Sequence, residues 1–92
     1  MVWSIDFLPK AEKHLDKLDT VNRERVLQFL HRRISTLENH RSMGEALAGK
    51  QFSGLWKYRL GDICIICQIK DKEITILVVR IGKRRDVFKK KR

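Results

Sequence analysis

The sequence predicts a single α+β domain over residues 1–92, in which a mainly antiparallel four-stranded sheet is covered on one face by an N-terminal helix hairpin. A short helix is expected at the C-terminal end, so the element order is β-α-α-β-β-β-α. Three observations support this prediction. The 92 residues, of which 42% are hydrophobic, suffice for one small core. Apolar residues recur with helical spacing in the N-terminal part of the chain, and they alternate with strand spacing after residue 54.

The N-terminal elements are a strand followed by two helices. Apolar and polar residues alternate over residues 2–7, which predicts a half-buried strand. Pro9 suits the first turn of a helix. The apolar face of this helix consists of Leu8, Ala11, Leu15 and Leu18. Asp19 and Thr20 offer cap oxygens for a second helix. The apolar stripe of the second helix consists of Val26, Leu27, Leu30, Ile34 and Leu37. Because almost nothing separates the helices, we expect an antiparallel hairpin.

The C-terminal part is predicted to be a meander of three strands. Residues 39–54 contain three glycines and are expected to be mostly loop. Strands are predicted over residues 55–60, 63–69 and 74–81, with short polar turns between them and Gly82 ending the last one. The third strand is nearly all apolar, as is typical of a central strand covered on both faces. Residues 83–90 are the expected C-terminal helix.

The two cysteines, Cys64 and Cys67, form a C-x-x-C pair. Such a pair in isolation suggests a redox couple or half of a zinc site. Here both lie in a predicted strand, where residues three apart point to opposite faces. We therefore expect two small buried hydrophobic residues, and neither a disulfide nor a metal site.

The charge of the chain indicates an anionic partner. The net charge is +10, from 21 Lys and Arg against 11 Asp and Glu. A field of this size attracts nucleic acid, anionic membranes or acidic proteins. Seven Lys and Arg lie in residues 83–92, although a basic end can equally be a solvated tail.

Motifs of secretion and of many enzyme classes are missing. No apolar run approaches the ~20 residues that cross a bilayer, and residues 1–7 do not resemble a signal peptide, so we expect a cytoplasmic protein that binds no membrane. There is no glycine-rich phosphate loop, H-E-x-x-H or G-x-S-x-G motif. His14 and His31 are expected on helix surfaces. We expect no cofactor and no metal, so any chemistry must use Lys and Arg.

Basic residues also lie within the predicted sheet. Lys57 and Arg59 are two apart on one strand, on the face that the helices leave open, and are expected to face solvent. Arg80 ends the last predicted strand, and residues 83–85 follow it. If these groups share one face, they form an anion-binding surface. Lys57 and Arg59 alone would more simply be solvated strand residues. Cations can stabilise the charge that develops when the 2′-hydroxyl of RNA attacks its own phosphate.

Three segments, residues 54–62, 65–68 and 79–88, resemble the RelE/ParE toxin superfamily. The opening strand, the segment 9–11 with its helix hairpin, and the loop residues 47–49 are similar as well. The resemblance covers nearly the whole chain and is closer to RelE, because the basic sheet residues are present. It implies a toxin of a type II toxin–antitoxin system that cuts mRNA in the A site of the 70S ribosome without metal. It also implies a cognate antitoxin that wraps around and silences the toxin, and a toxin–antitoxin complex that binds operator DNA. From the net charge of +10 we expect this antitoxin to be acidic and partly disordered, and to fold on binding.

The resemblance also implies roles for individual residues. Lys57 and Arg59 match the strand cations that act on the 2′-hydroxyl and the phosphate, and Arg84 matches the arginine that stabilises the transition state. The residues expected to bind RNA around them are Arg80, Lys83, Arg85, Phe88 and Lys89. Two positions depart from the family pattern: Cys64 replaces a strand arginine, and Phe88 replaces a tyrosine that can stack and exchange a proton. Slower cleavage, substitution by other basic residues and an attenuated toxin all remain open.

Two other functions remain open from the sequence. ParE-like toxins inhibit DNA gyrase by binding, and they generally lack the sheet cations. A general nucleic-acid-binding domain is supported by the charge alone.

Overall fold

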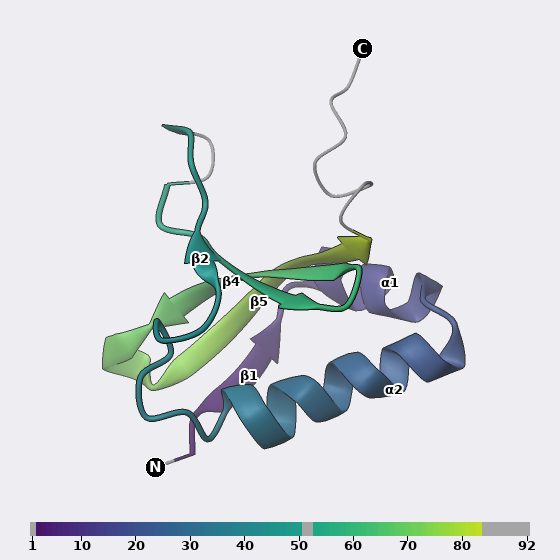
Figure 1. Ribbon diagram of the computed structural model, residues 1–92, viewed down its shortest axis with the longest axis horizontal. Helices are drawn as coiled ribbons and strands as arrows, with labels where there is room; N and C mark the ends of the chain where they lie inside the picture. Colours follow the sequence, from purple (N-terminus) through teal and green to yellow (C-terminus); the bar gives the residue numbers. More distant parts are fainter. Residues whose placement is uncertain (1, 51–52, 84–92) are drawn as a thin grey trace.

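A mixed five-stranded sheet forms the centre of the computed structural model, which describes residues 2–50 and 53–83 (Figure 1). The strand order is β1-β5-β4-β3-β2. The strands are β1 (Ser4–Phe7), β2 (Glu45–Ala46), β3 (Trp56–Leu60), β4 (Ile63–Lys70) and β5 (Thr75–Lys83). The helices are α1 (Pro9–Lys17), α2 (Thr20–Gln28), a π-helical continuation (Phe29–Ile34) and a short 3₁₀ turn (Asp71–Glu73).

The α+β fold and the β3-β4-β5 meander are confirmed, with two differences of detail, an additional strand and a longer β5. The sheet has five strands rather than four, because the segment predicted as loop contains β2, which pairs antiparallel with β3. Two residues are too few to produce an alternating pattern. β1 pairs parallel with β5 at the opposite edge. β5 also continues through Gly82 to Lys83 instead of ending before the glycine. The expected helix over residues 83–90 lies outside the described residues from residue 84 onward.

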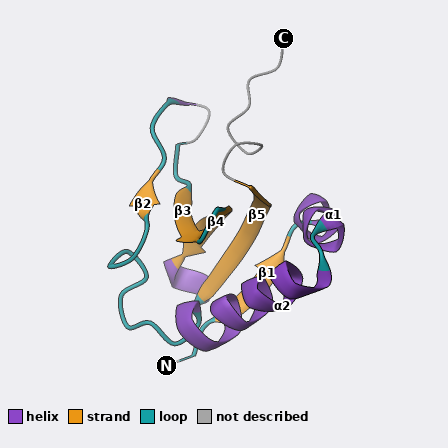
Figure 2. Cartoon of the chain, turned by 45° about the vertical axis from the view of Figure 1, so that its right-hand side comes forward, coloured by secondary structure: helices purple, strands orange, loops and turns teal. Residues whose placement is uncertain are grey.

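The two helices place their apolar faces in one core against the sheet (Figure 2). Ala11 and Leu15 of α1 and Val26 of α2 are buried, as their spacing predicts. The sheet residues of the same core are Tyr58, Ile63, Ile65, Cys67, Ile76, Val78 and Ile81. In the described part of the chain, no helix combines the length and the apolar character needed to cross a membrane.

The segment between the helices and β3 is tied to the sheet by two aromatic residues. The Tyr58 hydroxyl, inside the core, donates to the His40 carbonyl oxygen at 2.6 Å. The Trp56 indole N–H donates to the Met43 carbonyl oxygen at 2.7 Å. The His40 ring lies 4.1 Å from the Trp3 ring, centroid to centroid. These contacts fix the path of the chain into β2.

The cysteines lie on opposite faces of β4, as predicted. Cys67 belongs to the helix-side core, and burial raises the pKa of its thiol. Cys64 belongs to a second cluster with Ile66, against which Leu47 and Leu55 pack. The face without helices is therefore not fully open, because its centre is apolar and buried. Both thiols are free.

Candidate nucleic-acid interface

A row of four residues crosses the sheet on the face away from the helices. The strand register pairs Glu45 with Lys57, Lys57 with Ile66, and Ile66 with Arg80. Residues directly opposite each other in a ladder point to the same face, with Cβ atoms about 4.5–5.5 Å apart. Lys57 and Arg80 therefore lie on the same face of the sheet, and Ile66 of β4 is the one residue between them in this row. A second row pairs Arg59 with Cys64, so Arg59 lies on this face too. We call Lys57, Arg59 and Arg80 the sheet cations.

A β-bulge places Arg80 on this face. Ile66 pairs with Arg80 and Cys67 with Val78, so Val79 is an extra residue in β5. Before the bulge, even-numbered residues such as Val78 face the helices, and after it Ile81 does. In a regular strand Arg80 would share the face of Val78 and point into the core. Bulges re-aim side chains in this way.

The environment of Lys57 corrects the expectation of a solvent-facing cation. Lys57 is only 7% exposed, and its Nζ lies 2.7 Å from Oε2 of Glu45. The Glu45 side chain is 63% exposed. Arg59, by contrast, is exposed as expected. The two strand cations thus differ: Lys57 is held inside the surface by a carboxylate, and Arg59 extends into solvent.

A glycine brings Glu45 close to Lys57. Gly44 has a φ of +76°, which favours glycine, and a Cβ there would collide with the carbonyl oxygen of Lys57. The residue without a side chain lets β2 lie directly against β3. A shallow cavity of about 290 Å³ opens here. It is lined by Met43, Gly44, Glu45, Lys57, Tyr58 and Arg59.

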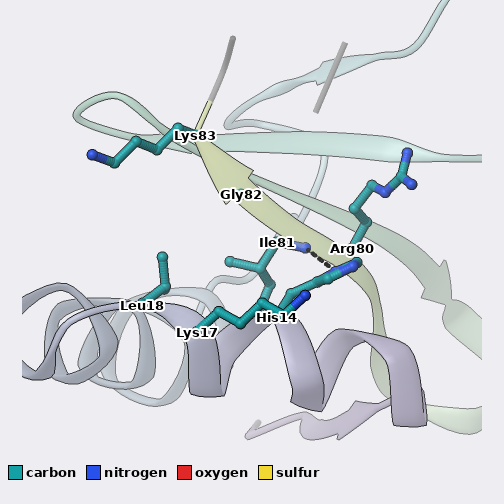
Figure 3. Close-up of a pocket in the computed structure, with 7 residues that line it drawn as sticks. All are labelled: His14, Lys17, Leu18, Arg80, Ile81, Gly82 and Lys83. Carbon is teal, nitrogen blue, oxygen red and sulfur yellow. Dashed lines mark hydrogen bonds between the residues drawn. The ribbon is translucent and has the colours of Figure 1, made fainter. Parts of the chain in front are cut away.

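A second cavity of about 310 Å³ lies where the end of β5 meets α1 (Figure 3). It is lined by His14, Lys17, Leu18, Arg80, Ile81, Gly82 and Lys83. His14 is half-buried rather than on the open helix surface, because its Nδ1 accepts a hydrogen bond of 3.4 Å from the Ile81 backbone N–H. His31 is exposed, as predicted. Burial lowers the pKa of His14, and the charges of Arg80, Lys17 and Lys10 lower it further.

Among residues 2–50 and 53–83, no three His, Cys, Asp or Glu side chains are grouped so that they could hold a metal ion.

The family comparison decides what kind of protein presents this basic surface. The family described as "ParE toxin of type II toxin-antitoxin system, parDE" matches residues 5–88. The chain belongs to this family. It is a toxin of a type II toxin–antitoxin system, within the RelE/ParE superfamily. No protein with a curated description matches it.

Several solved structures similar to this toxin are RelE proteins. The toxin–antitoxin complex RelBE2 from Mycobacterium tuberculosis matches at 21% identity and a TM-score of 0.82, over 91% of this chain and 93% of that chain. The isolated RelE toxin of E. coli matches at 22% identity and a TM-score of 0.68, over 88% and 83%. The RelB–RelE complex from Methanococcus jannaschii matches at 16% identity and a TM-score of 0.65, over 90% and 94%. At these identities the likeness establishes the fold.

The expected site residues of the toxin fall into three groups. Lys57, Arg59 and Arg80 share one face of the sheet. Lys83, which pairs with Ile63, lies at the end of β5 beside α1 and lines the second cavity. Four further expected residues lie outside the described residues: Arg84, Arg85, Phe88 and Lys89.

Three residues at the two cavities were not expected from the sequence. Glu45 was missed because it falls in a segment without a strand pattern. His14 and Lys17 were missed because helical spacing places them on a polar face, and it cannot show that this face meets the end of β5.

Proposed function

We propose that the toxin is an endoribonuclease that cuts mRNA in the A site of the 70S ribosome and so inhibits translation. The observation that carries this proposal is the common face of the sheet cations, Lys57, Arg59 and Arg80. Three cations brought together from two strands suit a phosphodiester better than an isolated charge does, because each RNA phosphate offers several acceptor oxygens. The resemblance to RelE toxins supports the same reading.

The proposed reaction needs no group beyond the RNA, these side chains and water. The 2′-oxygen of a ribose attacks the adjacent phosphorus, its proton passes to a water molecule, and the bond from phosphorus to the 5′-oxygen breaks. The leaving oxygen takes up a proton. Negative charge builds on the non-bridging oxygens, where fixed cations stabilise it most. Arg59 and Arg80 are exposed and can reach the phosphate. Arg84 is proposed to stabilise the transition state, and Lys57 to supply a charge whose place is fixed by Glu45.

The proposed partners follow from the charge and the family. A surface at +10 suits an acidic antitoxin that is partly disordered and folds on binding. Such a partner would mask the sheet cations, and the joint complex is proposed to bind operator DNA. The similar proteins from M. tuberculosis and M. jannaschii were solved as complexes with their antitoxins, which supports an antitoxin for this toxin. Action on ribosomes places the proposed activity in the cytoplasm.

The direct test is a cleavage assay with purified toxin, 70S ribosomes and a translated mRNA, read by mapping 5′ ends. Cuts within codons are expected only when ribosomes are present. Arg59→Gln should lower the cleavage rate by about 10²–10³, the usual effect of removing one group that stabilises an oxyanion. The matched control is Arg32→Gln, another exposed arginine, in the π-helical segment after α2. Equal rates for the two variants would remove Arg59 from the site, and no ribosome-dependent cuts by the unaltered toxin would refute the activity.

Inhibition of DNA gyrase by binding is the second candidate. The family description names ParE, and the ion pair with Glu45 offsets the charge of Lys57 on the sheet face. A plasmid supercoiling assay with purified gyrase separates the candidates. Loss of supercoiling together with gyrase–DNA cleavage complexes, without mRNA cuts, would replace the first proposal by the second.

A further inference from the structure

The cavity between α1 and the end of β5 is lined by basic groups from two elements. His14 and Lys17 come from α1, and Arg80 and Lys83 come from β5 (Figure 3). None of its seven lining residues is acidic. The hydrogen bond from Asn22 is the main cause of the lowered pKa of Asp19, the residue before α2, and the charge of Lys83 lowers this pKa further. The cavity is therefore lined by four basic residues, and the charged ends of Arg80 and Lys83 extend from it in opposite directions (Figure 3).

The hydrogen bond to Ile81 fixes which nitrogen of His14 carries the proton. Because Nδ1 accepts from the Ile81 N–H, the ring proton of neutral His14 is on Nε2. His14 can then act as a neutral donor, while Lys17, Arg80 and Lys83 supply charge. Burial and the neighbouring cations lower its pKa, in the order burial, Arg80, Lys17 and Lys10. A bound anion would offset the positive charge around this half-buried imidazole.

We propose that this cavity binds a backbone phosphate of RNA, adjacent to the phosphate held by the sheet cations. The proposal rests on the proposed function, because it assigns a second contact to the same RNA strand. His14 and Lys17 are its new residues.

Arg80 is the reason for choosing RNA over an acidic protein segment. This residue belongs to the sheet cations through its pairing with Ile66, and it also lines the cavity. The two basic sites are therefore continuous across the end of β5. An RNA strand presents a phosphate at every nucleotide, so one strand can occupy both sites. Phosphate contacts of this kind position a nucleic acid without reading its sequence.

The first test measures the pKa of His14 by NMR, with and without two probes. The probes are inorganic phosphate and a short 2′-O-methyl oligouridylate, which lacks the 2′-hydroxyl and is not cleaved. The oligouridylate is expected to raise the pKa of His14 toward the ordinary value of about 6.5. His31 is the internal control, since it is exposed and distant in the sequence. An unchanged pKa of His14 at saturating oligouridylate would overturn the proposal.

The second test removes the cations one at a time and measures oligouridylate affinity against salt concentration. Lys17→Ala should weaken binding about threefold or more and reduce the slope of log K against log salt by about 0.7. Lys72→Ala is the matched control, because it removes the same charge from the 3₁₀ turn before β5, at the opposite end of this strand. Equal effects of the two variants would overturn the proposal.

Two further outcomes distinguish the proposed phosphate site from the proposed endoribonuclease activity. If poly-glutamate raises the pKa of His14 and the oligouridylate does not, the cavity serves an acidic protein and the proposal fails. If the oligouridylate binds as expected but the toxin makes no ribosome-dependent cuts, the phosphate site stands and the proposed activity fails. The pKa of His14 and the affinity for the oligouridylate are binding measurements and do not depend on cleavage.

Discussion

Cys64→Arg is the substitution that most directly tests the sheet face. It restores the residue type expected from the family pattern, and it introduces a charge where the structure has a fully buried thiol. Cys64 lies between Arg59 on β3 and Gly82 on β5. An arginine here would meet a like charge on one side and the apolar cluster around Ile66 on the other. We therefore predict a folded but much less stable protein.

The magnitude follows from burial and chain length. An uncompensated buried charge costs about 3–5 kcal/mol. A chain of 92 residues loses roughly 5 °C of Tm per kcal/mol, from an unfolding entropy of about 2.1 cal/mol/K per residue. The Tm of Cys64→Arg should therefore fall by about 15–25 °C in a thermal melt followed by circular dichroism. Cys64→Val is the control, because an apolar side chain of similar size should cost less than about 1.5 kcal/mol.

The refuting result is an arginine variant that melts within about 5 °C of the valine variant. The arginine would then reach solvent, past Gly82, which has no side chain to block it. In that case the gain in cleavage expected from the family pattern becomes testable in the same protein. Higher ribosome-dependent cleavage by this stable variant would place position 64 in the active site.

Two further predictions concern the segment that leads into β2. Tyr58→Phe removes the donor to the His40 carbonyl and leaves a buried acceptor, so the free energy of unfolding should fall by about 1–3 kcal/mol in urea; a change below about 0.3 kcal/mol would contradict this. Burial lowers the pKa of His40 below its ordinary 6.5, so the unfolded chain binds the proton more readily. Stability should therefore be full above pH 6.5 and fall as the pH drops below it. His40→Gln should flatten this loss of Tm between pH 7.5 and 5.5, whereas the exposed-site control His31→Gln should not.

The sequence predicts most elements of this fold well because these have a clear apolar period, whereas β2 has none. The alternation in β3 places Trp56, Tyr58 and Leu60 in the helix-side core, as their parity indicates. The opposite positions of Cys64 and Cys67 follow from the same rule. Periodicity is a property of single elements, so it succeeds where an element is regular and several residues long.

The candidate site depends on features that no local pattern carries. The bulge at Val79 determines on which face Arg80 lies, and it is defined by the register between β5 and β4. The burial of Lys57 depends on Gly44, which allows β2 to approach. The cavity beside His14 exists because α1 and the end of β5 meet, although they are far apart in the chain. These are tertiary contacts, and the alternation of residues within one strand cannot predict them.

The spacing of Lys57 and Arg80 determines how strongly these two sheet cations repel each other. Arg80 lies two strands from Lys57, and the apolar Ile66 occupies the strand between them. Two strand spacings are about 10 Å, a little more than the screening length of about 8 Å at physiological ionic strength. At a separation of this size, salt screens most of the repulsion between the two charges, and Glu45 offsets the charge of Lys57 further. Long side chains can still converge on one phosphate from both sides, so the face can bind an anion without a large penalty to the fold.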